Sequence, residues 1–269
     1  EPILAEDPLA LLPAIAKLNA TLTQKENDDY CLRKVEFLVF GLIDQCDGLR
    51  EADRLNVLND FFFDHLKINI LAHSPQQIED LMLDHLLTHR RANSLLASLL
   101  YVYFSTRIEV PIYLINLNTH GLLKWVDGNT PKFIDLHDSG KILNSSTSLH
   151  LLNNHCQIDK EHCLDIIPLK QAFLKYMKCL IKLYEETQRT YQLKICLDYL
   201  LYIEKNDVSA LGKRALVNLR LNQEDAALCD LKRYLSFVNY TSAPHEIKIA
   251  FEGLVANKHF LEDTNILLH

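Results

Sequence analysis

Two short clusters of histidine and cysteine are the first residues in this sequence whose types could do chemistry. Imidazole and thiolate are the usual ligands of zinc, and the clusters are His155-Cys156 and His162-Cys163. Zinc sites separate paired ligands by two to four residues, whereas the side chains of adjacent residues point apart. We therefore expect no metal site here. The sequence also lacks a Gly-rich phosphate loop, so we expect no nucleotide or other cofactor.

The elements that would position any other reactive side chain are mainly helical in the N-terminal part. Apolar residues at helical spacing predict helices over 8–22, 30–43, 49–65 and about 94–104, with a further helix starting at Ser74-Pro75. Apolar and aromatic runs then predict strands over 110–115, 122–126 and 132–136. The sequence Asp127-Gly128-Asn129 is typical of a hairpin turn between the last two strands. The polar, irregular stretch from 138 to 165 predicts a linker.

This order of elements resembles that of papain-like and transglutaminase-like folds. In those folds a cysteine lies at the N-terminus of the helix, where the helix dipole favours its thiolate. A histidine on the following strand is the base, and an aspartate on the next strand orients it. The resemblance implies an α+β fold in which a helix and an antiparallel sheet meet at the reactive centre.

Three segments resemble the bacterial SirB-type family, which joins a transglutaminase-like domain to tetratricopeptide repeats. Arg90-Arg91-Ala92-Asn93-Ser94-Leu95-Leu96 resembles that family's Arg-x-Gly-x-x-x-Ser-Leu segment. Asn118-Thr119-His120-Gly121-Leu122-Leu123-Lys124 is similar to its Pro-Gly-His-Phe-Leu-Val-Arg segment. Phe133-Ile134-Asp135-Leu136, followed by Gly140-Lys141-Ile142-Leu143, resembles its Ile-Asp-Pro-Phe-Asn-Gly-Gly segment. The C-terminal residues 263–269 are also similar, so the resemblance extends over most of the chain in matching order.

Carried over residue by residue, the resemblance places the triad histidine at His120 and the triad aspartate at Asp135. The nucleophile position falls on Asn93, and Ala92 replaces the family's glycine. Asparagine has no ionisable nucleophile, and loss of the nucleophile costs about a millionfold in comparable hydrolases. Asparagine is, however, among the best helix N-caps, where it contributes about 1 kcal/mol. The sequence therefore predicts a vestigial triad in which Asn93 is a structural cap.

A relocated nucleophile remains the alternative. Ser94 is adjacent to Asn93, but one helical step of about 100° turns it away from a base placed for position 93. Cys31 and Cys46 lie far from His120 in sequence and would need a particular fold to reach it. This alternative is a cysteine- or serine-type hydrolase or acyl transferase that uses His120 and Asp135.

The C-terminal region repeats with a period of thirty-four residues. Apolar or aromatic residues coincide at this offset in six pairs: Met177 and Leu211, Ile181 and Ala215, Leu193 and Ala227, Leu197 and Leu231, Leu200 and Tyr234, and Leu201 and Leu235. Within each unit the spacing predicts two amphipathic helices joined by a short polar turn, at 187–189 and 222–224. Residues 245–257 could supply the first helix of a third unit.

This pattern resembles the tetratricopeptide repeat, in which small residues occupy the positions where the helices cross. Ala215 and Ala227 fall on those two positions. The sequence departs from the repeat at four other positions. Arg214 and Asn218 replace an apolar and an aromatic residue, and Lys205 and Asn239 replace the closing proline. The resemblance implies a curved surface of helical hairpins suited to holding a peptide or helix of a partner.

The composition bounds the class of protein. The 269 residues carry a formal net charge of −7, which disfavours nucleic acids and anionic membranes as partners. The apolar runs are too short to span a bilayer, and no signal peptide is evident. Seven scattered cysteines suit a reducing compartment, so we expect a cytoplasmic protein. They are residues 31, 46, 156, 163, 179, 196 and 229.

Together these observations predict a transglutaminase-like domain over 1–143, a linker over 144–166 and tetratricopeptide-like repeats over 167–269. The predicted function is that of a non-catalytic pseudoenzyme that acts as a protein-interaction or regulatory module. Its partner would be a protein or peptide bound by the C-terminal hairpins. A third hypothesis is a small-ligand binder that uses the vestigial cleft.

Overall fold

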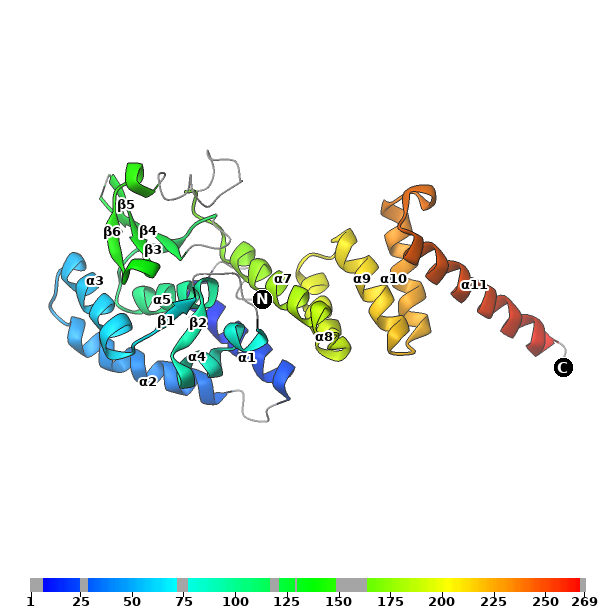
Figure 1. The fold of residues 1–269 in the computed structure, drawn as a ribbon, viewed down its shortest axis with the longest axis horizontal. Coiled ribbons are helices and arrows are strands. Elements are labelled where there is room, and N and C mark those ends of the chain that lie inside the picture. Colours follow the sequence, from blue (N-terminus) through cyan, green and yellow to red (C-terminus); the bar gives the residue numbers. More distant parts are fainter. Residues whose placement is uncertain are drawn as a thin grey trace. The chain divides into compact units, whose positions relative to one another are not determined.

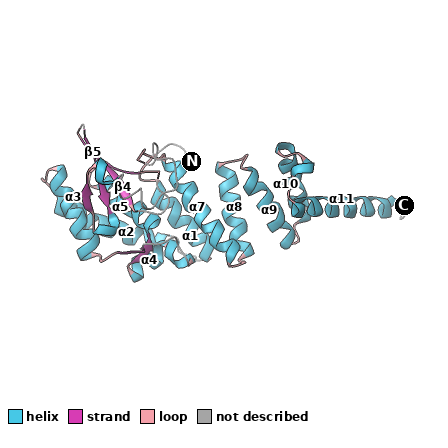
Figure 2. Ribbon diagram, turned by 45° about the horizontal axis from the view of Figure 1, so that its top comes forward, coloured by secondary structure: helices cyan, strands magenta, loops and turns pink. Residues whose placement is uncertain are grey.

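The structure is a computed structural model that describes residues 7–24, 29–71, 77–116, 121–128, 130–148 and 164–266. The chain forms two compact units, unit 1 (Glu1–Cys179) and unit 2 (Leu180–His269), and the boundary falls inside helix α7 (Leu169–Glu186). All strands of the described chain belong to unit 1, whereas unit 2 is helical (Figure 2). Among the described residues, no helix combines the length and apolar character needed to cross a membrane.

Unit 1 is built from helices that precede a small sheet. They are α1 (Leu11–Thr23), α2 (Asp29–Cys46), α3 (Glu51–Asn59), which continues as a π-helix (Asp60–His65), a 3₁₀-helix (Ile78–Leu81), α4 (Leu83–His89) and α5 (Ser94–Arg107). The helices predicted over 8–22, 30–43, 49–65 and 94–104 are confirmed with shifted ends. The proposed helix start at Ser74-Pro75 lies outside the described residues.

Helix α5 is the centre of unit 1. Eleven of its fourteen residues are buried, because α1, α2 and α3 pack on it and strand β3 (Ile112–Leu114) contacts it as well. Figure 1 shows α5 between the sheet and the N-terminal helices. A helix that is apolar nearly all round is suited to such a buried position. The core therefore holds α5 rigidly, and its N-terminus meets the sheet at a fixed place.

The main sheet is antiparallel, with the strand order β3, β4 (Leu122–Asp127), β5 (Thr130–Asp135) and β6 (Lys141–Leu143). Asp127 pairs with Thr130, and Gly128 has a φ of 62°. This left-handed conformation is typical of the hairpin turn that the sequence predicts here. Strand β6 corrects the prediction that the chain is irregular from 138 onward.

A second, parallel pair of strands was not predicted. Strand β1 (Asn69–Leu71) pairs with β2 (Arg91–Asn93), and Leu71 is aligned with Asn93. Strands of three residues are too short to show an alternation of apolar and polar side chains, which explains why the sequence pattern misses them. Strand β2 leads directly into α5, so this pairing fixes the position of the residue before the helix.

Unit 2 contains the C-terminal part of α7 and four further helices. They are α8 (Thr190–Ile203), α9 (Val208–Arg220), α10 (Glu224–Phe237) and, after a 3₁₀-helix (Tyr240–Ser242), α11 (His245–Ile266). Helices α8 and α10 begin and end thirty-four residues apart. Gln188 and Asn222, also thirty-four residues apart, have φ values of 54° and 57° in the turns between helices. Helix α11 begins later than the period requires, because the 3₁₀-helix precedes it.

Eleven of the twelve positions that coincide at this offset are buried, and the exception, Leu235, is half-buried. Helix α9 packs against both α8 and α10. The apolar periodicity of this region therefore marks the faces that the helices bury against one another.

Candidate functional site

Asn93 is the last residue of β2 and the N-cap residue of α5. Its backbone is extended, with φ −70° and ψ 163°, and its Oδ1 accepts a hydrogen bond from the backbone N–H of Leu96 at 2.9 Å. The residue is only 2% exposed. The predicted cap is thus present, and the side-chain oxygen is engaged with the first turn of the helix.

Asp135 ends β5 and is also held by local structure. Its Oδ1 accepts a hydrogen bond from the backbone N–H of His137 at 2.9 Å, which caps the 3₁₀-helix Leu136–Asp138. Its backbone carbonyl accepts a hydrogen bond from the N–H of Gly140. Asp135 is aligned with Leu122 on β4 and with Lys141 on β6, so it lies on a central strand near the start of β4.

His120 lies outside the described residues, but its neighbour Gly121 is described. A Cβ added at Gly121 would lie 3.6 Å from the Cβ of Ser94, 3.2 Å from the Cβ of Leu136 and 3.7 Å from Cδ2 of His137. The carbonyl of Gly121 accepts a hydrogen bond from Leu136 N–H. Three residues therefore meet at one junction between α5 and the sheet: Ser94, Gly121 and Leu136. In the sequence they directly follow the predicted triad positions Asn93, His120 and Asp135.

Ser94 is the residue at this junction that was considered as a relocated nucleophile. Its Cβ lies 3.6 Å from the place that a Cβ at Gly121 would occupy, just before β4. Since His120 lies outside the described residues, the prediction that Ser94 turns away from it stays untested. The tight contact at Gly121 leaves little room for a larger residue there. Ser94 is 5% exposed and lies near Gly121, the residue that follows His120 in the sequence.

Of the two cysteines considered as relocated nucleophiles, Cys46 is poorly suited to that role. Burial raises the pKa of the Cys46 thiol, and this effect outweighs the nearby positive charge of Arg54. Cys46 is 4% exposed, and Cys31 lies on the same helix, α2. A thiol with a raised pKa carries less thiolate, which is the reactive form.

No group of three or more histidine, cysteine, aspartate or glutamate side chains in the described part of the chain could hold a metal ion. The two predicted clusters, 155–156 and 162–163, fall in a stretch that the structure does not describe. They therefore stay untested.

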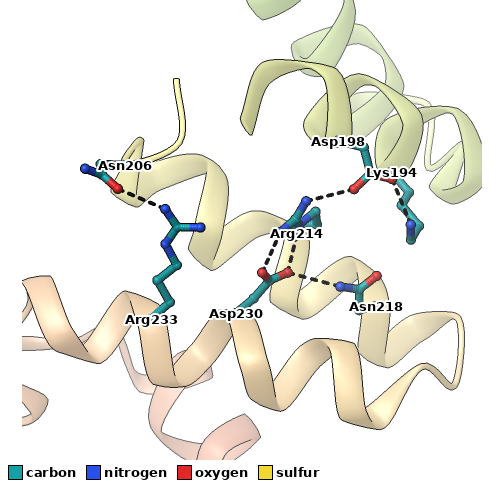
Figure 3. A network of polar contacts seen from close by, with 7 residues as sticks. All are labelled: Lys194, Asp198, Asn206, Arg214, Asn218, Asp230 and Arg233. Atoms are coloured by element: carbon teal, nitrogen blue, oxygen red, sulfur yellow. Dashed lines mark hydrogen bonds and ion pairs between the residues drawn. The ribbon is translucent and has the colours of Figure 1, made fainter. Parts of the chain in front are cut away.

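Unit 2 contains a polar network that includes two of the residues that depart from the repeat pattern (Figure 3). Arg214 on α9 donates two hydrogen bonds to Asp230 on α10, at 2.6 and 2.8 Å, and one to Asp198 on α8 at 2.9 Å. Asn218 also donates to Asp230, and Lys194 donates to Asp198. The contact with Asp230 raises the pKa of the Arg214 guanidinium. The network joins three successive helices by charge-assisted bonds.

A family model described as the transglutaminase-like superfamily matches residues 14–174, which is 161 of the 269 residues. Comparison with curated proteins gives no significant match, and comparison with solved structures gives none either. The matched region contains α5, the sheet and the junction at which the neighbours of Asn93, His120 and Asp135 meet. Since the match covers more than half of the chain, this protein belongs to the transglutaminase-like superfamily.

Proposed function

We propose that the chain is a non-catalytic transglutaminase-like protein that binds a protein or peptide partner through its C-terminal helices. The proposal includes a bacterial SirB-type origin and tetratricopeptide-type repeats over 167–269, joined by a linker over 144–166 to a transglutaminase-like domain over 1–143. The partner is held on the helical hairpins, and the degenerate junction contributes no chemistry.

The observation that carries the proposal is the state of Asn93. It occupies the position at which the resemblance places the nucleophile, and it is buried and bound to the N–H of Leu96. An amide side chain has no ionisable nucleophilic atom. The position therefore stabilises α5 instead of attacking an acyl group.

The thirty-four-residue spacing of helices and turns supports the repeat part of the proposal. The spacing matches the period of tetratricopeptide repeats, and stacked helix pairs of that kind present extended binding surfaces. Tyr191 and Tyr202 are exposed on α8 at 54% and 62%. They are eleven residues apart, so they share one face of the helix. Exposed tyrosines of this kind are enriched at interfaces.

The absence of catalysis is tested with the purified chain, amine donors, and peptide-glutamine, ester and amide substrates. We expect no product above that of an Asn93→Ala control. Turnover that disappears in His120→Ala would instead show that the junction is active.

The binding role is tested by comparing proteins captured by the chain, by a Tyr191→Ser/Tyr202→Ser variant and by a Phe37→Ser variant. Phe37 is 78% exposed on α2 in unit 1 and serves as the matched control. We expect a partner that the tyrosine variant loses and the Phe37 variant keeps. A partner set that is the same for all three proteins would argue against binding at this face of α8.

One observation favours a second candidate, a serine-type hydrolase or acyl transferase. Ser94 lies at the start of α5 and near Gly121, which follows His120 in the sequence. A hydroxyl there would need His120 as its base. Hydrolysis of an activated ester that is lost in both Ser94→Ala and His120→Ala, but kept in Cys46→Ala, would support this candidate over the first.

A further inference from the structure

A cavity of about 810 Å³ opens in unit 1 at the C-terminal end of α5. Its walls include Val102 and Thr106 from α5, Ile112 and Leu114 from β3, and Ile167 just before α7. Sequence reasoning missed this cavity because its residues come from segments far apart in the chain. A volume of this size is typical of sites for small molecules.

The cavity is separate from the junction that contains Asn93. Val102 and Thr106 follow Ser94 by eight and twelve residues on the same helix. At 1.5 Å per residue, they lie about 12 and 18 Å along α5 from its start. A molecule in the cavity would therefore not contact the vestigial triad positions, and its binding does not depend on whether the junction is catalytic.

The walls of the cavity are largely apolar. Four of the lining side chains are at most 7% exposed: Val102, Ile112, Leu114 and Ile167. Strand β3 forms an edge of the sheet. Directly after its last residue, Ile115 forms an isolated antiparallel bridge with Ile166. These side chains favour an aliphatic ligand, because each apolar group that leaves water on binding adds to the affinity.

Two carboxylates also line the cavity, and they differ in their partners. Glu109 is 83% exposed at its side chain and forms an ion pair with Arg54. Glu51 accepts a hydrogen bond from the indole N–H of Trp125 through Oε1 at 2.7 Å. Among the described residues, no ion pair includes Glu51 and no hydrogen bond uses its second side-chain oxygen. Glu51 is thus an oriented acceptor that lacks a cationic partner, beside an apolar wall.

We propose that this cavity binds a small amphipathic amine, with the ammonium group at Glu51 and the alkyl chain along Val102, Ile112 and Ile167. An ammonium donates hydrogen bonds to a carboxylate and supplies the missing positive charge. A carboxylate ligand of the same length would bring a second negative charge to the site and is disfavoured.

Trp125 provides a direct readout, because it is the sole tryptophan of the chain and donates its indole hydrogen bond to Glu51. Butyl-, hexyl- and octylammonium are titrated into the full chain, with indole fluorescence and calorimetry as parallel measurements. We expect a saturable change with all three probes and an affinity that rises about fourfold for each added methylene. Octanoate should give no saturable change.

The variant Glu51→Gln keeps an acceptor for Trp125 and removes the charge. We expect it to weaken octylammonium binding at least tenfold, whereas Glu109→Gln changes it less than twofold. Thr106→Phe places a bulky side chain at the cavity wall and should weaken the binding of all three amines. Circular dichroism of each variant confirms that it is folded. Two results would overturn the proposal. One is equal binding of octylammonium and octanoate, and the other is an unchanged affinity for octylammonium in Glu51→Gln or in Thr106→Phe.

Discussion

At the scale of single residues, Asn93 shows how one buried amide can serve the fold. The buried amide caps a helix that is itself almost wholly buried, so the cap is formed in the core of unit 1. A carbonyl acceptor at this place satisfies an N–H that the helix leaves without an internal partner. The same residue therefore explains both the stability of α5 and the proposed lack of a nucleophile.

Replacing Asn93 by alanine removes this cap. We expect Asn93→Ala to lower the free energy of unfolding by about 1 to 2 kcal/mol, whereas Asn93→Ser, which can still accept the bond, should lose less. Urea denaturation monitored by Trp125 fluorescence measures both. Equal losses in the two variants would mean that packing, and not the cap, is what asparagine supplies.

Tyr103 predicts a dependence of stability on alkaline pH. Burial, together with hydrogen bonding to Glu36, raises the pKa of Tyr103 to about 12. Unfolded tyrosine titrates near pH 10, so the folded form holds its proton more tightly. The resulting stabilisation is fully present below about pH 10 and is lost as the pH rises toward 12.

We expect Tyr103→Phe to reduce the loss of stability between pH 10 and 12. Denaturation midpoints measured at several pH values in this range test the expectation. The substitution Tyr191→Phe, at an exposed tyrosine, is the control. If both variants follow the wild-type pH dependence, Tyr103 is not the group responsible.

At the scale of elements, the network around Arg214 adds charged hydrogen bonds to the apolar packing between α8, α9 and α10. Asp230 is 6% exposed at its side chain, whereas Asp198 is 41% exposed. A buried charge that loses its partner costs about 3 to 5 kcal/mol, whereas an exposed pair contributes about 1 kcal/mol or less. The two aspartates that bind Arg214 should therefore differ strongly in their effect on stability.

We expect Arg214→Met to destabilise unit 2 by about 3 to 5 kcal/mol, because it leaves Asp230 buried beside Asn218 only. The double variant Arg214→Met/Asp230→Leu should recover most of this loss, since apolar residues can replace a buried pair. Asp198→Ala should cost about 1 kcal/mol or less. Amide hydrogen exchange in α9 and α10 measures each effect. A double variant no more stable than Arg214→Met would show that the charged pair itself is required.

The elements also show what the sequence could predict. Long helices rich in apolar residues and the Asp-Gly-Asn hairpin follow from local patterns, so α2, α5, α8 and the β4–β5 turn were predicted. The three-residue strands β1, β2 and β6 carry no such pattern. The partners of Arg214 were not predictable, because Asp198 and Asp230 reach it only after three helices have packed together. The Glu51 cavity was missed for the same reason. The role of His120 cannot follow from its sequence position, since a base is defined by what lies beside it.

At the scale of the whole molecule, the chain holds two cores of different character. Unit 1 buries α5 among helices and a sheet, whereas unit 2 buries successive helices along a repeating period. Each unit has its own fully buried leucines, for example Leu100 in unit 1 and Leu231 in unit 2. Compact units with separate cores unfold as separate cooperative steps when few contacts join them.

This organisation predicts that destabilising one core leaves the other transition in place. Leu231→Ala should cost unit 2 about 2 to 5 kcal/mol and speed amide hydrogen exchange in α9 and α10, with little effect on the unfolding transition that the fluorescence of Trp125 reports in unit 1. Leu100→Ala should shift the fluorescence transition by a similar free energy and leave the amide exchange of α9 and α10 unchanged. Since Trp125 is the sole tryptophan, its signal reports on unit 1 alone. If either substitution moves both transitions together, the two units fold as one, and the partner-binding helices cannot be treated as an independent module.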